Sequence, residues 1–121
     1  MLNLKILQDP GYIKTMAYIK QRKILRSFGQ VITPFVYQPN DLHGMSAIRK
    51  STQNNGIMLS ANTIRKHLTF LKECGFIIEV DGVCQSNKTK LPVLEMAYIV
   101  LLTLHKHFFG KKHFWEKKEK E

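Results

Sequence analysis

The clearest run of helically spaced apolar residues in this chain begins after Ser60 and ends before Gly75. Its apolar members are Ala61, Ile64, Leu68 and Leu71. Because residues at this spacing share one face of an α-helix, the run predicts a helix that is buried on one side. The hydroxyl group of Ser60 can cap the first turn, and Gly75 can adopt the left-handed conformation that commonly ends a helix.

A β-hairpin is predicted directly after this helix. Residues 76–80 favour a short strand, and Asp81-Gly82 is a two-residue turn signal. We expect the polar segment that continues to Lys90 to form the tip of the hairpin. A return strand would then begin near Thr89, and Pro92 would place that strand at a sheet edge.

A longer helix is predicted near the start of the chain. Asp9 and Pro10 are typical of a helix N-terminus, and helically spaced apolar residues continue to about Phe28, where Gly29 would end the helix. Its other faces carry basic residues: Lys14, Lys20, Arg22, Lys23 and Arg26. These cations fit either a helix that crosses a phosphate backbone or an ordinary solvated surface.

Between these two helices, the pattern predicts a strand and a shorter helix. Residues 31–37 are rich in β-branched and aromatic side chains and therefore favour a strand, which Pro34 would confine to a sheet edge or a bulge. Residues 42–54 contain helically spaced apolar positions and predict the shorter helix. Asn55-Gly56 then supplies a left-handed turn that leads into the next helix.

The C-terminal part of the chain contains its most apolar segment, residues 93–109. A helix that is hydrophobic nearly all round must be buried on several sides. We therefore expect a helix that packs on its own domain and also on a second copy of the chain, although a strand followed by a short helix also fits. The chain divides into a domain over residues 1–92, the apolar helix over residues 93–110 and a charged tail over residues 111–121.

Composition and charge narrow the possible partners. A chain of 121 residues with 44% hydrophobic residues forms one ordinary globular domain. Its 19 Lys and Arg residues exceed its 9 Asp and Glu residues, which gives a formal net charge of +10 at pH 7. A surface of this kind attracts polyanions. Nucleic acid is the first expectation, and an anionic membrane surface is the alternative.

The same patterns bear on the cellular compartment. No secretory signal peptide is visible, and the apolar window 91–104 is shorter than the roughly 20 residues that span a bilayer. Only two cysteines occur, Cys74 and Cys84, so we expect reduced thiols rather than a disulfide framework. The expected location is the cytoplasm, with no membrane insertion.

The run from Leu59 to Ile77, L-S-x-x-T-I-x-x-x-L-x-x-L-x-x-x-G-F-I, resembles the recognition helix and first wing strand of winged helix-turn-helix proteins. The resemblance covers roughly residues 42–94. It implies a mostly helical α+β fold, a helix that enters the major groove of double-stranded DNA, and a homodimer formed through the C-terminal helix. The sequence departs from this pattern in its second helix, which contains Gly44 and Ser46 and has a sparse apolar face.

The side of the predicted helix opposite its leucines carries amide, hydroxyl and cationic groups. The resemblance implies that Asn62, Lys66 and Thr69 contact base edges or phosphates. It also implies that Ser60, Thr63 and Arg65 hold the DNA backbone, and that Lys88 and Lys90 hold it from the wing. The alternative for the helix is ordinary amphipathic packing on a strand, and the alternative for the wing segment is a plain solvent loop.

Other chemistry has little support in the sequence. His105, His107 and His113 are close together, but a structural zinc site needs about four ligands at defined spacing. No nucleophilic pair or phosphate-binding glycine loop is evident, so we expect no enzyme activity, no metal and no cofactor. His67 is expected to be a buried structural histidine, whereas the pattern gives Phe70 no clear place. A protein-interaction module and a membrane-surface protein remain as alternative functions.

Overall fold

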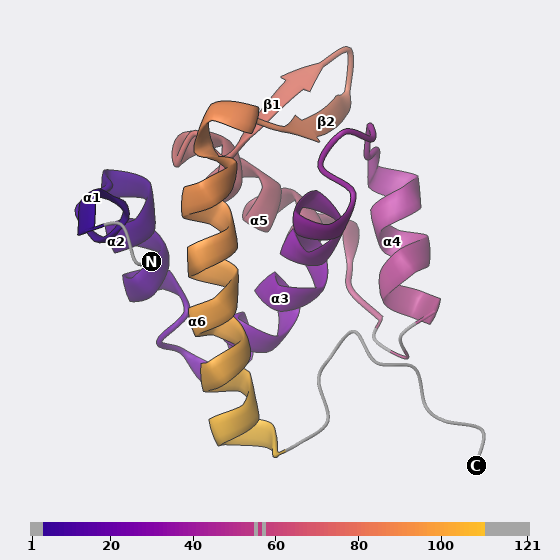
Figure 1. Cartoon of the computed structure of the whole chain (residues 1–121). Coiled ribbons are helices and arrows are strands. Elements are labelled where there is room, and N and C mark those ends of the chain that lie inside the picture. Colours follow the sequence, from indigo (N-terminus) through magenta and orange to yellow (C-terminus); the bar gives the residue numbers. More distant parts are fainter. Residues whose placement is uncertain (1–3, 55, 57, 111–121) are drawn as a thin grey trace.

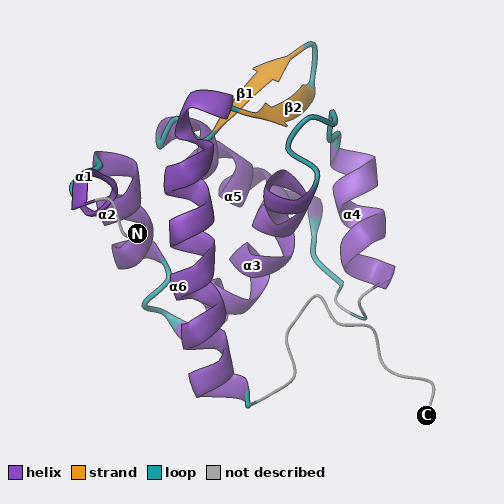
Figure 2. Ribbon diagram, in the orientation of Figure 1, coloured by secondary structure: helices purple, strands orange, loops and turns teal. Residues whose placement is uncertain are grey.

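Six α-helices and one β-hairpin make up residues 4–54, 56 and 58–110, the part of the chain described by the computed structural model (Figures 1 and 2). The elements are α1 (Leu4–Leu7), α2 (Pro10–Tyr18), α3 (Arg22–Tyr37), α4 (Met45–Asn54), α5 (Ala61–Glu73), β1 (Ile77–Val80), β2 (Val83–Ser86), the 3-10 turn η1 (Lys88–Lys90) and α6 (Leu91–Phe109). The predicted fold class, α+β and mostly helical, is therefore confirmed.

The core is built around α3, which packs against α4, α5, α6 and β2. Figure 1 shows α3 between α6 and α4, with the hairpin at one end of the helices. The inward residues of α3 are fully buried: Leu25, Phe28, Val31, Ile32 and Phe35. Ile48 of α4, Ile64 of α5 and Leu101 of α6 meet them in one hydrophobic cluster.

Two predictions about the first half of the chain are wrong. The single helix expected over residues 10–28 is two helices, because the chain leaves helical geometry after Tyr18 and α3 begins at Arg22. No glycine or proline stands at this break. The fully buried side chain of Ile19 lies there, so tertiary packing and not a local signal accompanies the change of direction.

Residues 31–37 form the second half of α3 and not the predicted strand. Their apolar side chains continue the helical spacing set by Leu25 and Phe28, and burial of that continuous stripe outweighs the β preference of the individual residues. Pro34 stands in the last turn of the helix, where its carbonyl group accepts a 2.9 Å hydrogen bond from the Gln38 amide. The helix therefore ends soon after the proline.

The hairpin is shorter than predicted. Asp81 and Gly82 have φ angles of 53° and 83°, and this left-handed pair reverses the chain at once, so that Val80 pairs with Val83. The return strand is therefore β2 and does not begin near Thr89, which lies in η1. Pro92 is likewise not at a sheet edge but in the first turn of α6, where its missing N–H group has no helical partner to lose.

A single residue, His43, forms an isolated β-bridge beside the hairpin. The backbone amide of His43 donates to the carbonyl oxygen of Cys84 over 2.7 Å, and the Cys84 amide donates to the His43 carbonyl oxygen over 2.9 Å. The His43 ring is also buried, 4.9 Å from the ring of Phe35. The bridge ties the segment before α4 to β2.

The elements nearest the candidate site follow the prediction closely. The shorter helix is α4, and the next helix is α5, whose first turn is capped by Ser60 through a 3.1 Å hydrogen bond from the Thr63 amide. Gly56 and Gly75, both with φ of 81°, adopt the left-handed conformation that the sequence predicts there. Local capping and turn signals are thus sufficient to define this part of the chain.

The apolar C-terminal segment is one helix, α6, and not a strand followed by a short helix. Most of its apolar side chains are covered within the same chain, because α6 packs on α1, α2 and α3. Ile99, with 56% of its surface exposed, is the main apolar exception along the middle of the helix. Within residues 4–54, 56 and 58–110, none of the helices combines the length and apolar character needed to cross a membrane.

The contact between α2 and the end of α5 gives a first testable prediction. A Cβ atom at Gly11 would lie 2.8 Å from the Cys74 carbonyl oxygen, so Gly11→Ala forces the two elements apart. We expect this substitution to lower the free energy of unfolding by about 1–3 kcal/mol in urea denaturation. At Gly44 an added Cβ would meet only a Val83 methyl group at 3.5 Å, so Gly44→Ala serves as the control, with an expected loss of about 1 kcal/mol or less. Equal losses in both variants would contradict the close contact at Gly11.

Candidate functional site

The exposed side of α5 brings together four of the predicted site residues: Asn62, Arg65, Lys66 and Thr69. They line a shallow surface hollow of about 490 Å³, whose other walls come from Tyr18, Phe70 and Glu73. Their spacing on the helix places two cations, one amide and one hydroxyl group on the same surface. The structure thus brings Arg65 together with Asn62, Lys66 and Thr69, and the contact of these residues with DNA stays a prediction.

Ser60 and Thr63 lie at the start of this surface and form the helix cap. The Ser60 hydroxyl accepts from the Thr63 amide and donates to the Thr63 hydroxyl over 3.0 Å. One turn further on, the Arg65 guanidinium donates to the Asn62 side-chain oxygen over 3.0 Å. The Lys66 ammonium group is exposed and, within the part of the chain that the structure describes, forms no ion pair.

A buried histidine fixes the opposite side of α5 to α2 and α3. His67 is 1% exposed, and its ring nitrogens Nδ1 and Nε2 lie 2.8 Å from the Tyr18 hydroxyl and 2.7 Å from the Ser27 hydroxyl. The Ser27 hydroxyl also lies 3.3 Å from the Ile24 carbonyl oxygen, to which it can donate. A neutral His67 with its proton on Nε2 satisfies this arrangement. The Ser27 oxygen then accepts a hydrogen bond from the Nε2–H group, while the Tyr18 hydroxyl donates a hydrogen bond to Nδ1. The prediction that His67 is structural is confirmed.

Aromatic contacts around this network account for Phe70, which the sequence pattern left without a place. The rings of Phe70 and Tyr18 are stacked 3.8 Å apart at an angle of 6°, and Phe28 meets Phe70 edge to face at 5.7 Å. The ring stacking with Phe70 and the hydrogen bond to His67 both join Tyr18, at the end of α2, to α5. The exposed side of α5 is therefore presented by a helix whose inner side is held at several points.

Lys88 and Lys90 do not lie at the hairpin tip, so their predicted location is wrong. The tip consists of Asp81 and Gly82, whereas both lysines belong to η1, after the return strand. The two-residue turn starts the return strand at Val83, so the hairpin is complete at Ser86, before the chain reaches the lysines. Lys88 is exposed on η1, and contact of these lysines with DNA phosphates stays a prediction.

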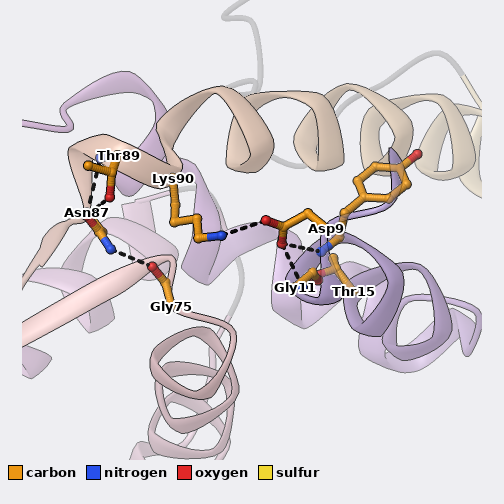
Figure 3. Close-up of polar contacts among 8 residues, drawn as sticks. Asp9, Gly11, Thr15, Gly75, Asn87, Thr89 and Lys90 are labelled. Atoms are coloured by element: carbon orange, nitrogen blue, oxygen red, sulfur yellow. Dashed lines mark hydrogen bonds and ion pairs between the residues drawn. The ribbon is translucent and has the colours of Figure 1, made fainter. Parts of the chain in front are cut away.

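Lys90 instead joins η1 to the start of α2 (Figure 3). Its ammonium group lies 2.6 Å from Oδ2 of Asp9, while Oδ1 of Asp9 accepts a 2.8 Å hydrogen bond from the Gly11 amide. Partial burial acts to raise the pKa of Asp9, but the hydrogen bond and charge of Lys90 and the capped amides together lower it. Asn87 completes the junction by donating to the Gly75 carbonyl oxygen over 2.9 Å.

Several of the contacts that hold the site join residues far apart in the sequence, and sequence analysis missed them. They include the Tyr18 and Ser27 hydrogen bonds to His67 and the ion pair between Asp9 and Lys90. The last of these joins positions 81 residues apart. No local periodicity indicates such pairs, although the buried edge position of His67 did indicate a need for polar partners.

Metal binding finds no additional support in the described residues. Among them, no three His, Cys, Asp or Glu side chains form a group that could hold a metal ion. His105 is buried and His107 is exposed, while His113 lies outside the described residues. Cys74 and Cys84 are buried free thiols, and burial raises the pKa of each.

Comparisons of the chain with models of protein families, with curated proteins and with solved structures found no match. The interpretation of the α5 surface therefore depends on its own geometry and charge. Those features are an exposed helix face with cationic, amide and hydroxyl groups, and a buried inner face that fixes its direction.

The buried histidine predicts a specific pH dependence of stability. Burial, with a smaller contribution from the Lys66 charge, lowers the pKa of His67 to about 4 in the folded chain, against 6.5 when it is unperturbed. The unfolded chain therefore binds the proton first, and stability is lost as the pH falls from 6.5 towards 4. The full loss is roughly 3 kcal/mol.

This dependence can be measured by urea denaturation at several pH values between 7.5 and 4.5. We expect His67→Gln to flatten the slope over this range, because glutamine keeps hydrogen-bonding groups but does not titrate. His107→Gln, at an exposed position, is the matched control and should keep the wild-type slope. If His67→Gln retained that slope as well, another group would be responsible.

Proposed function

We propose that this chain is a winged helix-turn-helix DNA-binding protein in which α5 is the recognition helix. The order of elements supports the proposal: α3, the one-residue bridge at His43, α4, α5 and then the hairpin follow one another as a first helix, a bridge to the sheet, two helices and a wing. The proposed function is a regulator that binds double-stranded DNA in a sequence-specific manner, in transcription, replication or DNA transfer.

The observation that carries this proposal is the exposed face of α5. An α-helix fits the major groove of B-DNA, and side chains on its outer face can then reach base edges. Asn62, Arg65, Lys66 and Thr69 supply the donors, acceptors and positive charge that such a contact requires. The stacked Tyr18 and the hydrogen-bonded His67 keep the inner face of this helix in place, which reduces the cost of ordering it on DNA.

The contacts along α5 refine the roles of these residues. Asn62 accepts one hydrogen bond from Arg65, and its oxygen has a second lone pair and its amide nitrogen two N–H groups with which to bond adenine. Lys66, one turn away, can reach guanine or phosphate from the same surface. Ser60 and Thr63 are engaged with each other in the cap, so in this proposal the start of the helix approaches the backbone through that cap.

The proposal also includes the homodimer, but less evidence supports it than the apolar composition of α6 suggested. Packing on α1, α2 and α3 accounts for most of the apolar composition of α6, so this composition alone is weak support for a second copy. The remaining support is the exposed side chain of Ile99 in the middle of the helix. DNA binding by α5 does not depend on this contact.

Binding to duplex DNA gives the direct test of the proposed function. The logarithm of the affinity should fall linearly with the logarithm of salt concentration, with a slope of about −0.9 for each phosphate neutralised. On a duplex selected from a random pool, Lys66→Ala and Asn62→Ala should each cost about 1–3 kcal/mol, and they should cost less on random duplex. Fluorescence anisotropy at two salt concentrations measures both quantities.

A matched control separates a specific contact from net charge. Lys50→Ala removes the same charge from the exposed side of α4 and should change both affinities by a similar, small amount. Loss of selected-site binding in Lys50→Ala equal to that in Lys66→Ala would show that total charge alone drives binding. Absence of duplex binding at low salt would remove the DNA proposal.

A further inference from the structure

A second hollow lies where the start of α3, the connection between α4 and α5, and the end of α6 meet. Its volume is about 460 Å³, within the range of roughly 300–1,000 Å³ typical of small-ligand pockets. The residues that give it its chemical character are Arg22, Lys23, Arg26, Met58, Leu59 and Phe109. None of its lining residues also lines the hollow on α5, so the two sites are separate.

The charge on this hollow is entirely positive. Arg22, Lys23 and Arg26 contribute three cations from two turns of one helix, and among the described residues no carboxylate lines the space. The two ion pairs found among the described residues, Lys72 with Glu79 and Lys90 with Asp9, lie elsewhere. Three like charges on so short a stretch repel one another, and an anion between them would relieve that repulsion.

The two arginines are held in position by the end of α6. Their guanidinium carbons lie 4.9 Å and 5.5 Å from the centre of the Phe109 ring, and Arg22 donates to the Phe108 carbonyl oxygen over 3.2 Å. A guanidinium group has five N–H donors, so these contacts leave donors for a bound anion. Their fixed position also lowers the entropy lost when an anion binds.

The lining of the hollow also includes apolar side chains. Met58, which is 76% exposed, lines it together with Leu59 and Phe109. A methionine at such a place can adapt its unbranched side chain to the shape of a ligand. An anionic group at the arginines and an apolar body against these three side chains would satisfy both kinds of lining side chain.

We propose that this hollow binds a small organic anion with an apolar body, such as an aromatic carboxylate. The charge of the ligand would lie between Arg22, Lys23 and Arg26, and its hydrocarbon part would cover Met58. The site does not depend on the proposed contact between α5 and DNA. It adds a ligand-binding role to the chain, next to the connection that leads into the α5 cap.

Isothermal titration calorimetry on the full chain with three probes tests this site. We expect 2-naphthoate to bind with a stoichiometry of one, and 2-naphthalenemethanol, which has the same ring system without the charge, to bind at least about tenfold more weakly. Acetate, which has the charge without the ring system, should show no measurable binding. Equal binding of naphthoate and the neutral alcohol, or no binding of naphthoate, would overturn the proposal.

Substitutions of lining residues test whether 2-naphthoate binds in this hollow. Lys23→Glu and Met58→Ala change exposed side chains of the hollow and should each weaken naphthoate binding, the first by about tenfold or more. Lys50→Glu, the same charge reversal at an exposed position on α4, should leave it within about twofold. Similar weakening in Lys23→Glu and Lys50→Glu would place the probe elsewhere on the basic surface and overturn the proposal.

Random duplex DNA distinguishes this site from a DNA contact. If duplex binds and Lys23→Glu weakens it far more than the matched reversal Lys50→Glu does, the cations belong to the DNA surface and the small-ligand site is wrong. If duplex fails to bind while naphthoate binding persists, the DNA proposal fails and this site stands. Naphthoate binding that is lost in Lys23→Glu but kept in Lys66→Ala is the result that we expect.

Discussion

The burial of α3 is the constraint on which the other elements depend. Its apolar stripe is completely covered, and every side of that cover is a different element: α4, α5, α6 and β2. Polar contacts help to set how the neighbouring elements are oriented on α3. Ser27 forms a hydrogen bond with His67 of α5, and the Thr33 hydroxyl lies 3.0 Å from the Tyr98 hydroxyl of α6. The Phe35 carbonyl oxygen accepts a hydrogen bond from Ser86 of β2 over 2.5 Å. The orientation of the α5 surface therefore follows from the position of α3.

The two sides of α5 differ in chemistry, and under the proposed function the inner side serves the fold while the outer side meets DNA. The inner side holds a buried, hydrogen-bonded histidine, and the stacked rings of Tyr18 and Phe70 lie at the edge of the hollow. The outer side holds cations that face solvent and gain little from the fold itself. A basic surface displayed on so firmly packed a helix is the feature that favours a role in binding polyanions over a purely structural one.

Sequence patterns were most reliable where local chemistry is decisive. The Ser60 cap, the left-handed Gly75 and the Asp81-Gly82 turn are each set by one or two residues, and the helix and hairpin between them were predicted for that reason. The strand predicted at residues 31–37 failed because apolar, β-branched residues fit a strand and a buried helix equally well, and only the shared stripe with Phe28 decides between them.

The candidate site likewise combines features that the sequence predicts with features that it does not. Its four exposed residues on α5 follow from helical spacing alone, so the sequence was sufficient to group them. Its supports were not predictable, since Tyr18 and His67 are 49 residues apart and meet only after α2 has packed on α5. The lysines after the hairpin were misplaced because their location depended on where the return strand began, and a single two-residue turn shifted it.

A titration with duplex DNA, followed by two-dimensional nitrogen–proton NMR, tests the central claim that α5 is the surface that meets DNA. The account predicts that the amide signals of residues 60–69 shift most, and that signals of α6 around Ile99 stay in place. Shifts concentrated on α6, or none along α5 while the duplex binds, would contradict it.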